Sequence, residues 1–157
     1  MDRNNLYNNF RLILRDQDFV HKNSLKKYMN CGDLPGISFV NCSFENVNLT
    51  GSVFGSCNFE NCTFNDFTSR KGSFSTCHFE NCKIIDSDMT RSDFYDVYFK
   101  NCKFYNVDLT ASDCYECKLK STEFFKSNLD LISVHDVKVY ESGRWIKIKD
   151  FSSFKNT

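Results

Sequence analysis

Proline and glycine are scarce in this sequence, with one and six residues among 157. The glycines are not clustered, so the chain has no phosphate-binding glycine loop. The formal net charge is zero, which excludes the global basic signature of proteins that bind nucleic acid or membrane surfaces. No apolar run approaches the roughly 18 residues of a membrane span, and the N-terminus lacks the pattern of a secretory signal. We therefore expect a cytoplasmic protein with no membrane contact and no direct nucleic-acid contact.

Groupings of catalytic or metal-binding residues are also missing. The three histidines, His21, His78 and His135, lie far apart in the sequence, and none has a nucleophile placed for base catalysis. Cys114 and Cys117 have the spacing of a metal or redox pair, but no second pair completes the four ligands that zinc usually takes. We predict that both point inward, and that the protein has no enzymatic activity, no metal and no cofactor.

Two residue types are unusually common, with 17 Phe and nine Cys. An odd number of cysteines in a chain without an export signal argues against a disulfide framework. The positions of most cysteines indicate small buried residues instead. Only Cys31 falls outside the repeat described next, and it has no interpretation from the sequence.

An apolar residue recurs every five positions along most of the chain. Steps of five from Phe39 to Val139 give 21 positions, which we call centres, and 20 of them are apolar while Ser69 is not. A second series, from Cys42 to Ser127, lies two positions before the centres and consists of small residues, apart from Phe67. A period of five fits neither a long helix nor a long strand, so each five residues must form a short extended step and a turn.

A longer period indicates how the steps close. Asn followed by Cys recurs every twenty residues, at Asn41, Asn61, Asn81 and Asn101. Twenty residues are four of these five-residue steps, so the chain returns to the same side after four steps and forms a square coil. We interpret these asparagines as structural turn residues rather than as a binding motif. Stacked coils about 4.8 Å apart would place large residues in internal columns, one with Phe39, Phe59, Phe79 and Phe99 and another with Phe44, Phe64 and Phe104.

The repeat is clearest in the segments CNFEN, CTFND, CHFEN, CKFYN, VDLTA and SDFYD. They resemble the repeat of the pentapeptide-repeat family, and the resemblance covers about residues 37–141. It implies an all-β fold, the right-handed quadrilateral β-helix, whose handedness agrees with the general rule for parallel crossovers. We therefore divide the chain into an N-terminal helical cap and lead-in (1–36), a β-helix of about five coils (37–141) and a C-terminal cap (142–157).

Caps are expected because a solenoid exposes backbone and apolar side chains at both ends. Residues 5–16 have apolar side chains at helical spacing, which predicts a short helix that is a lid or a partner-binding element, and a second helix is expected near 24–30. Residues 143–154 alternate like a half-buried strand, with Trp145 expected to close the last coil. The resemblance also implies a homodimer through this end, as the alternative to a plain cap. A local bulge is expected in the irregular segment 67–72.

Charge becomes informative when the outward positions are sorted by face. On the face with centres 54 to 134, carboxylates alternate with tyrosines in the C-terminal half, with His135 beyond them and no Lys or Arg among them. Lysines gather on the face with centres 59 to 139, which we take to lie opposite. Exposed tyrosines among carboxylates suit a basic protein partner, and the alternative is an ordinary solvated face. The candidate partner-binding residues are Asp93, Tyr95, Asp96, Asp113, Tyr115, Glu116 and Asp136.

The leading hypothesis is a rigid, non-catalytic scaffold that binds an unidentified protein partner. The resemblance implies an alternative, because some pentapeptide-repeat proteins mimic DNA, bind DNA gyrase and protect it from quinolones. This sequence departs from those proteins in three ways. Its first coils carry Ser73, Ser75 and Thr76 instead of acids, its coils have no inserted loop, and the irregular segment FTSRKG is basic.

Overall fold

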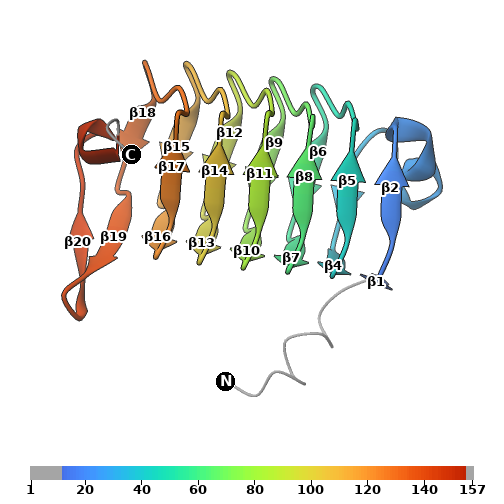
Figure 1. The fold of residues 1–157 in the computed structure, drawn as a ribbon, viewed down its shortest axis with the longest axis horizontal. Helices are drawn as coiled ribbons and strands as arrows, with labels where there is room; N and C mark the ends of the chain where they lie inside the picture. The colour runs from blue at the N-terminus through green and yellow to red at the C-terminus, as the bar shows by residue number, and fades with distance from the viewer. Residues whose placement is uncertain (1–11, 155–157) are drawn as a thin grey trace.

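The protein forms a four-sided β-helix in the computed structural model, which describes residues 12–154 (Figure 1). Three sides are β-sheets, and the fourth is a column of isolated β-bridges. We number these sides as faces 1 to 4, in the order in which the chain visits them. The predicted all-β quadrilateral solenoid of about five regular coils is confirmed.

The strands of each face follow one another from coil to coil. Face 1 contains β1 (Leu12–Arg15), β4 (Ile37–Val40), β7 (Asn58–Glu60), β10 (His78–Glu80), β13 (Tyr98–Lys100), β16 (Lys118–Lys120), β19 (Lys138–Glu141) and β20 (Arg144–Lys147). Face 2 contains β2 (Asp18–Val20), β5 (Ser43–Glu45), β8 (Thr63–Asn65), β11 (Lys83–Ile85), β14 (Lys103–Tyr105) and β17 (Glu123–Phe125). Face 4 contains β3 (Leu34–Pro35), β6 (Val53–Gly55), β9 (Ser73–Ser75), β12 (Asp93–Tyr95), β15 (Asp113–Tyr115) and β18 (Ser133–His135). The bridges of face 3 join Asn48, Thr68, Asp88, Asp108 and Asn128.

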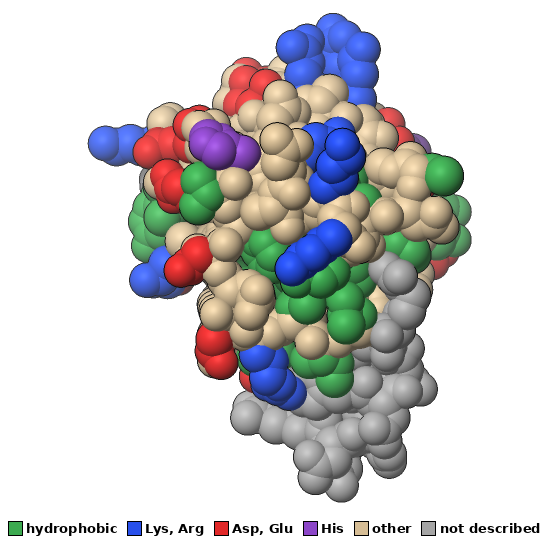
Figure 2. Space-filling model, turned by 90° about the vertical axis from the view of Figure 1, so that its right-hand side faces the viewer, with side chains coloured by type: hydrophobic (Ala, Val, Ile, Leu, Met, Phe, Trp, Pro, Cys, Tyr) green, Lys and Arg blue, Asp and Glu red, His purple; other side chains and the backbone are tan. Residues whose placement is uncertain are grey.

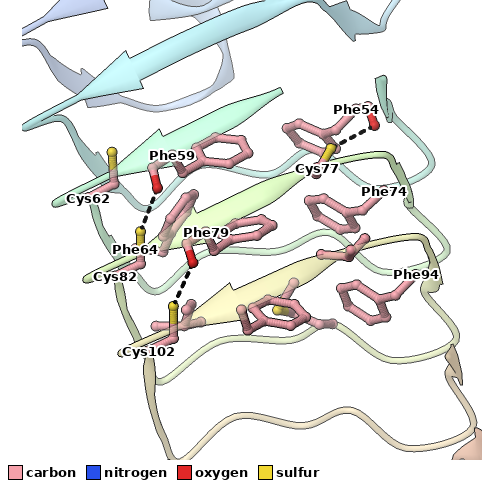
Figure 3. Close-up of a cluster of buried hydrophobic side chains, with 14 of the residues drawn as sticks. Phe54, Phe59, Cys62, Phe64, Phe74, Cys77, Phe79, Cys82, Phe94 and Cys102 are labelled. Carbon is pink, nitrogen blue, oxygen red and sulfur yellow. Dashed lines mark hydrogen bonds between the residues drawn. The ribbon is translucent and has the colours of Figure 1, made fainter. Parts of the chain in front are cut away.

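The centres of successive coils pack against one another in the interior (Figure 3). On face 1, the Phe59 ring stacks on Phe39 at 5.1 Å and on Phe79 at 4.6 Å between centroids. On face 4, Phe54 and Phe74 stack at 4.5 Å. These spacings match the separation of neighbouring strands, and rings from adjacent faces meet edge to face, a favourable geometry for aromatic pairs. The predicted phenylalanine columns are confirmed.

The cysteines two positions before the centres connect one coil to the next. The Cys82 thiol donates a hydrogen bond to the Phe59 carbonyl at 3.3 Å, and Cys102 donates to Phe79 at the same distance (Figure 3). Burial and two neighbouring thiols raise the pKa of Cys82 well above its ordinary value, so this thiol stays protonated and keeps its donor. These cysteines therefore combine small volume with a bond between coils.

All nine cysteines are free, and Cys31 is the exposed one. Cys114 is a centre and Cys117 lies two positions before the next centre, and both are buried as predicted. Burial and a hydrogen bond with Cys117 raise the pKa of Cys114, with the hydrogen bond as the larger cause. This pair belongs to the packed interior.

Each corner of the coil is made by the residue two positions after a centre. Every fifth residue from Asn41 to Asp136 has positive φ, and only Gly51 among them is a glycine. Asparagine and aspartate tolerate this conformation better than other non-glycine residues. At one corner the asparagines also bond along the axis, with Nδ2 of Asn61 3.2 Å from Oδ1 of Asn41 and similar bonds above it. The structural interpretation of this asparagine column agrees with these contacts.

Residues 67–72 keep the register of the other coils, so the predicted bulge is wrong. The amide of Ser69 donates to the Asp88 carbonyl at 2.9 Å, as the ladder requires. The irregularity lies in the side chains instead. Phe67 is buried where other coils have a small residue, and its ring meets Phe64 edge to face at 5.1 Å. The larger residue of this repeat therefore occupies the position two before the centre, and the centre itself is the small Ser69.

The N-terminal coil differs from the regular ones. Residues 12–15 form strand β1 rather than part of the predicted helix, because Leu14 pairs with Phe39 in the face 1 ladder. The remainder of that expected helix, residues 5–11, lies outside the described residues. Near 24–30 the chain forms two 3₁₀ turns, η1 (Lys22–Ser24) and η2 (Lys26–Tyr28), instead of the expected second helix. Leu25 between them is fully buried and fills this end of the core, where Figure 2 shows apolar side chains gathered.

The C-terminal residues close the other end. Strand β20 turns back on β19 as an antiparallel hairpin through Ser142 and Gly143, both with positive φ. Trp145 does not close the last coil as predicted, because it lies on the outside of the sheet and is 40% exposed. Phe151 is buried instead and meets Phe124 edge to face at 6.0 Å, just before the 3₁₀ turn η3 (Ser152–Phe154). The described residues contain no helix that is long and apolar enough to span a membrane.

Ser69→Ala is expected to stabilise the protein by about 1 kcal/mol, because its hydroxyl is the one buried side-chain polar atom in residues 12–154 without a hydrogen-bond partner. Ser92→Ala is the matched control of opposite sign. Its hydroxyl donates to the Ser69 carbonyl at 2.8 Å, and losing that bond should cost about 1 kcal/mol. Urea unfolding measures both changes. A Ser69→Ala variant less stable than the parent would contradict the lack of a partner.

Candidate protein-binding face

The predicted binding residues come from three neighbouring strands of face 4 and from the corner that follows each strand. Side chains alternate along a strand, so the centres of β12, β15 and β18 point inward and the residues on either side point outward. The ladder aligns Asp93 with Asp113 and Tyr95 with Tyr115, and it aligns Tyr115 with His135. Residues twenty positions apart in the sequence thus become direct neighbours on the surface.

Three outward columns make up this surface. One contains Asp93 and Asp113. The second, which we call the aromatic ladder, contains Tyr95, Tyr115 and His135. The two tyrosine rings are 5.2 Å apart and within 9° of parallel, and His135 tilts against Tyr115 at 5.8 Å. The tyrosines remain 49% and 44% exposed, so their ring surfaces are available to a partner. The third column, the acidic corner, contains the positive-φ residues Asp96, Glu116 and Asp136.

The carboxylates of Asp93 and Asp113 face each other across the ladder without a basic side chain between them. Burial, and to a smaller extent the charge of Asp113, raises the pKa of Asp93. Like charges placed directly opposite each other destabilise a sheet. The surface therefore contains negative charge that the fold itself does not neutralise.

Asp136 differs from the other acids of the corner. Its carboxylate lies 3.1 Å from Nζ of Lys147 in strand β20. The hydrogen bond from Lys147 and the charge of Lys138 lower the pKa of Asp136. The C-terminal hairpin thus occupies this carboxylate. Within residues 12–154, no salt bridge reaches Asp93, Asp96, Asp113 or Glu116.

The lysine-bearing side is face 1, and it lies next to face 4 rather than opposite to it as predicted. Each strand of face 4 leads directly into the following strand of face 1, as β15 leads into β16. Lys118, Lys138 and Lys147 are aligned in one row across β16, β19 and β20. Negative and positive columns therefore meet along the acidic corner.

An aromatic group on face 1 was not anticipated from the sequence. Trp145 packs edge to face against Tyr140 at 5.2 Å and against Tyr98 at 6.0 Å, and Nζ of Lys120 lies 4.4 Å from the Tyr140 centroid. The five-residue phase indicates that both tyrosines point outward, but it contains no signal for the hairpin that brings Trp145 to them.

The histidines do not form a site. His135 belongs to the aromatic ladder, and His78 lies on face 1 with its ring 5.9 Å from Tyr98. Burial lowers the pKa of His78. His21 lies at a corner of the N-terminal coil with positive φ. Within residues 12–154, no group of three or more His, Cys, Asp or Glu side chains could hold a metal ion.

The fold and its repeat define a β-helical repeat protein. The family model for pentapeptide repeats matches eight copies of the repeat, over residues 33–66 and 73–110. These residues of the chain are pentapeptide repeats, as their resemblance to that family suggested. No curated protein sequence matches it significantly.

Several solved structures resemble this chain at low sequence identity. Full-length QnrB1, a plasmid-mediated fluoroquinolone resistance protein, is 13% identical, with 83% of this chain and 92% of that chain covered and a TM-score of 0.38. The pentapeptide-repeat protein Rfr23 from Cyanothece 51142 is 13% identical, with coverages of 84% and 82% and a TM-score of 0.19. HetL from Nostoc sp. strain PCC 7120, involved in heterocyst differentiation regulation, is 12% identical, with coverages of 73% and 64% and a TM-score of 0.23.

Asp93→Asn is expected to raise the melting temperature at pH 7, because it removes one of two opposed carboxylates. The pKa of Asp93 is raised in the folded state, so the fold disfavours its ionised form. That penalty is absent below the ordinary pKa of the carboxyl group and develops as the pH rises through the raised pKa. The gain should stay below about 1 kcal/mol at pH 7, because solvent screens the pair, and it should disappear at pH 3.

Glu123→Gln provides the control for this measurement, since Glu123 lies 3.7 Å from the Lys103 ammonium and its neutralisation should give no gain. Thermal unfolding of both variants and the parent at the two pH values is the experiment. An equal gain from Asp93→Asn at pH 3 and pH 7 would show that charge is not its cause.

Proposed function

We propose that this protein is a rigid, non-catalytic scaffold that binds a basic protein partner through the C-terminal half of face 4. The main support is a set of exposed carboxylates around two stacked, exposed tyrosines. These carboxylates have no salt bridge in the described part of the chain, and they belong to Asp93, Asp96, Asp113 and Glu116.

The backbone beneath these side chains is held on both sides by neighbouring coils. The amide of Asp96 donates to the Tyr115 carbonyl at 2.9 Å, and the amide of Glu116 donates to the His135 carbonyl at 2.8 Å. A surface ordered in advance loses little conformational entropy when it binds. Tyrosines supply contact area with few rotatable bonds, and the carboxylates attract and orient a basic partner.

The neighbouring lysines restrict which partners fit. Lys118 and Lys138 border the acidic corner, so a uniformly basic surface that extends beyond this corner would meet repulsion. A partner must therefore match a narrow negative strip, or carry acidic residues where it crosses onto face 1. Unfavourable contacts of this kind give specificity as well as orientation.

We further propose that the C-terminal residues act as a cap rather than as a dimer interface. Phe151 and Phe154 both pack on Phe124 and cover the last coil without a second copy. The many buried free thiols fit a reducing compartment, so we expect the partner to be a cytoplasmic protein.

Reversing two charges should remove binding without affecting the fold. Asp113 and Glu116 are both exposed, so the Asp113→Lys/Glu116→Lys variant is expected to fold. It should capture at least tenfold less of the partner from a lysate than the parent does. The matched control is Asp66→Lys/Asp86→Lys, which makes the same charge change at exposed corner residues after face 2. Quantitative mass spectrometry of the captured proteins is the measurement. Equal capture by the parent and the face 4 variant would move the binding site to another face.

DNA mimicry toward gyrase is the alternative partner hypothesis. Duplex DNA presents about one negative charge per 1.7 Å along its axis, whereas strands β6 and β9 of face 4 carry no outward acid. The mimic would therefore extend over only three coils. We expect micromolar protein to leave gyrase supercoiling unchanged, with and without a quinolone. Inhibition of supercoiling, or protection from the quinolone, would establish gyrase as the partner instead.

A further inference from the structure

The aromatic ladder of face 4 ends abruptly at Tyr95. One face of its ring stacks on Tyr115, while the preceding residues in the same column are Ser75 and Gly55. A Cβ atom added at Gly55 would meet no atom within 4 Å, so the surface at this position is open. Beside the uncovered face of Tyr95, the column therefore has only small residues over two coils, a length of roughly 10 Å along the axis at the spacing of neighbouring strands. We call this place the step. No ring contact of Tyr95 other than the one with Tyr115 occurs in residues 12–154.

Polar and charged groups surround this step. Asp93 and Asp96 lie on either side of Tyr95 in the sequence, both exposed. Ser73 and Thr76 lie on either side of Ser75, one coil below, and offer hydroxyl acceptors. An occupant would therefore find one flat aromatic surface, two carboxylates and several hydroxyl groups. These features suit a planar cation.

The corner toward face 3 has the opposite charge. Lys71 and Arg91 occupy positive-φ positions there, two residues before Ser73 and Asp93. They repel a cation from that side and favour its approach over Tyr95 and Asp96. The step is thus polarised across its width, and this polarity sets the direction in which a cationic side chain enters.

We propose that the step beside Tyr95 is a binding site for an arginine side chain of the partner, whose guanidinium group stacks on the free face of Tyr95 and continues the aromatic ladder by one level. This inference rests on the function proposed above and specifies its recognition chemistry. Guanidinium is planar, stacks on aromatic faces and forms paired hydrogen bonds with carboxylates. A lysine ammonium is a compact, strongly hydrated charge that cannot stack in this way. The site therefore selects arginine over lysine, although both carry one positive charge.

The test is an NMR titration of the full chain with N-acetyl-arginine amide and N-acetyl-lysine amide as matched probes, at about 0.15 M salt. The arginine probe is expected to shift the Tyr95 ring signals and the amides of Ser75 and Asp96, with an affinity about fivefold above that of the lysine probe. Equal shifts with the two probes would overturn the arginine site while leaving charge-driven binding to face 4 in place.

Two variants separate stacking from charge. Tyr95→Leu removes the ring and Ser75→Leu fills the step, and both retain every carboxylate. In each variant, the affinities for the arginine probe and the lysine probe should become about equal. The control is Tyr105→Leu, which removes an outward-facing ring of face 2 that stacks on Phe125 at 4.9 Å. This variant should leave the titration unchanged. Retained preference in both step variants would refute the site. If the probes behave as expected but the Asp113→Lys/Glu116→Lys variant still captures the partner, that partner binds at another face, and the arginine site beside Tyr95 stands.

Discussion

One backbone constraint governs this molecule: a residue with positive φ is needed at every corner. The left-handed conformation costs a non-glycine residue roughly 1–2 kcal/mol, yet only Gly51 among the regular corners is a glycine. The ladder of hydrogen bonds between coils must offset this cost at each turn. It also fixes where the outward columns lie, since corner residues of successive coils are stacked. The asparagine column and the acidic corner are two versions of one requirement. The first uses the corner side chains to bond along the axis, and the second leaves Asp96 and Glu116 facing solvent.

The interior is a second consequence of the same periodicity. Two residues in each five point inward, and their volumes have to add up in every coil. Cysteine suits the smaller position because its thiol donates to the carbonyl of the coil before it, which alanine could not do. The sequence predicted these columns well, because both periods keep their phase along the repeat. It predicted a bulge at residues 67–72 wrongly, since a five-residue pattern does not reveal that a repeat with a large Phe67 and a small Ser69 can keep the register of its neighbours. Whether such a repeat keeps its register is visible only in three dimensions.

The candidate surface was predictable to a similar extent. A period of twenty predicts that Asp93 lies next to Asp113 and Tyr95 next to Tyr115, and the strand pairing of β12 with β15 has this register. The features that the sequence did not predict lie at the two ends of the solenoid, where the period stops. The neutralisation of Asp136 by Lys147 depends on a hairpin that follows the last regular repeat. The N-terminal coil likewise takes a register offset of 25 residues between Leu14 and Phe39, which breaks the spacing of twenty and turned an expected helix into a strand. The order of the faces was available from the sequence, because centres five residues apart belong to adjacent sides.

A strictly periodic solenoid offers no distinct site, because each coil presents much the same surface as the one before. Specific recognition must then come from departures from the period. On face 4 the departure is the change from Gly55 and Ser75 to Tyr95 along one column, which ends an aromatic stack with one ring face uncovered. The rigid ladder makes this step useful, because it holds the uncovered ring and the neighbouring carboxylates in fixed positions before any partner arrives. The same rigidity prevents the surface from adapting to a differently spaced set of charges. Affinity and selectivity at this face would therefore depend on one local interruption of the repeat, supported by the regular coils on both sides of it.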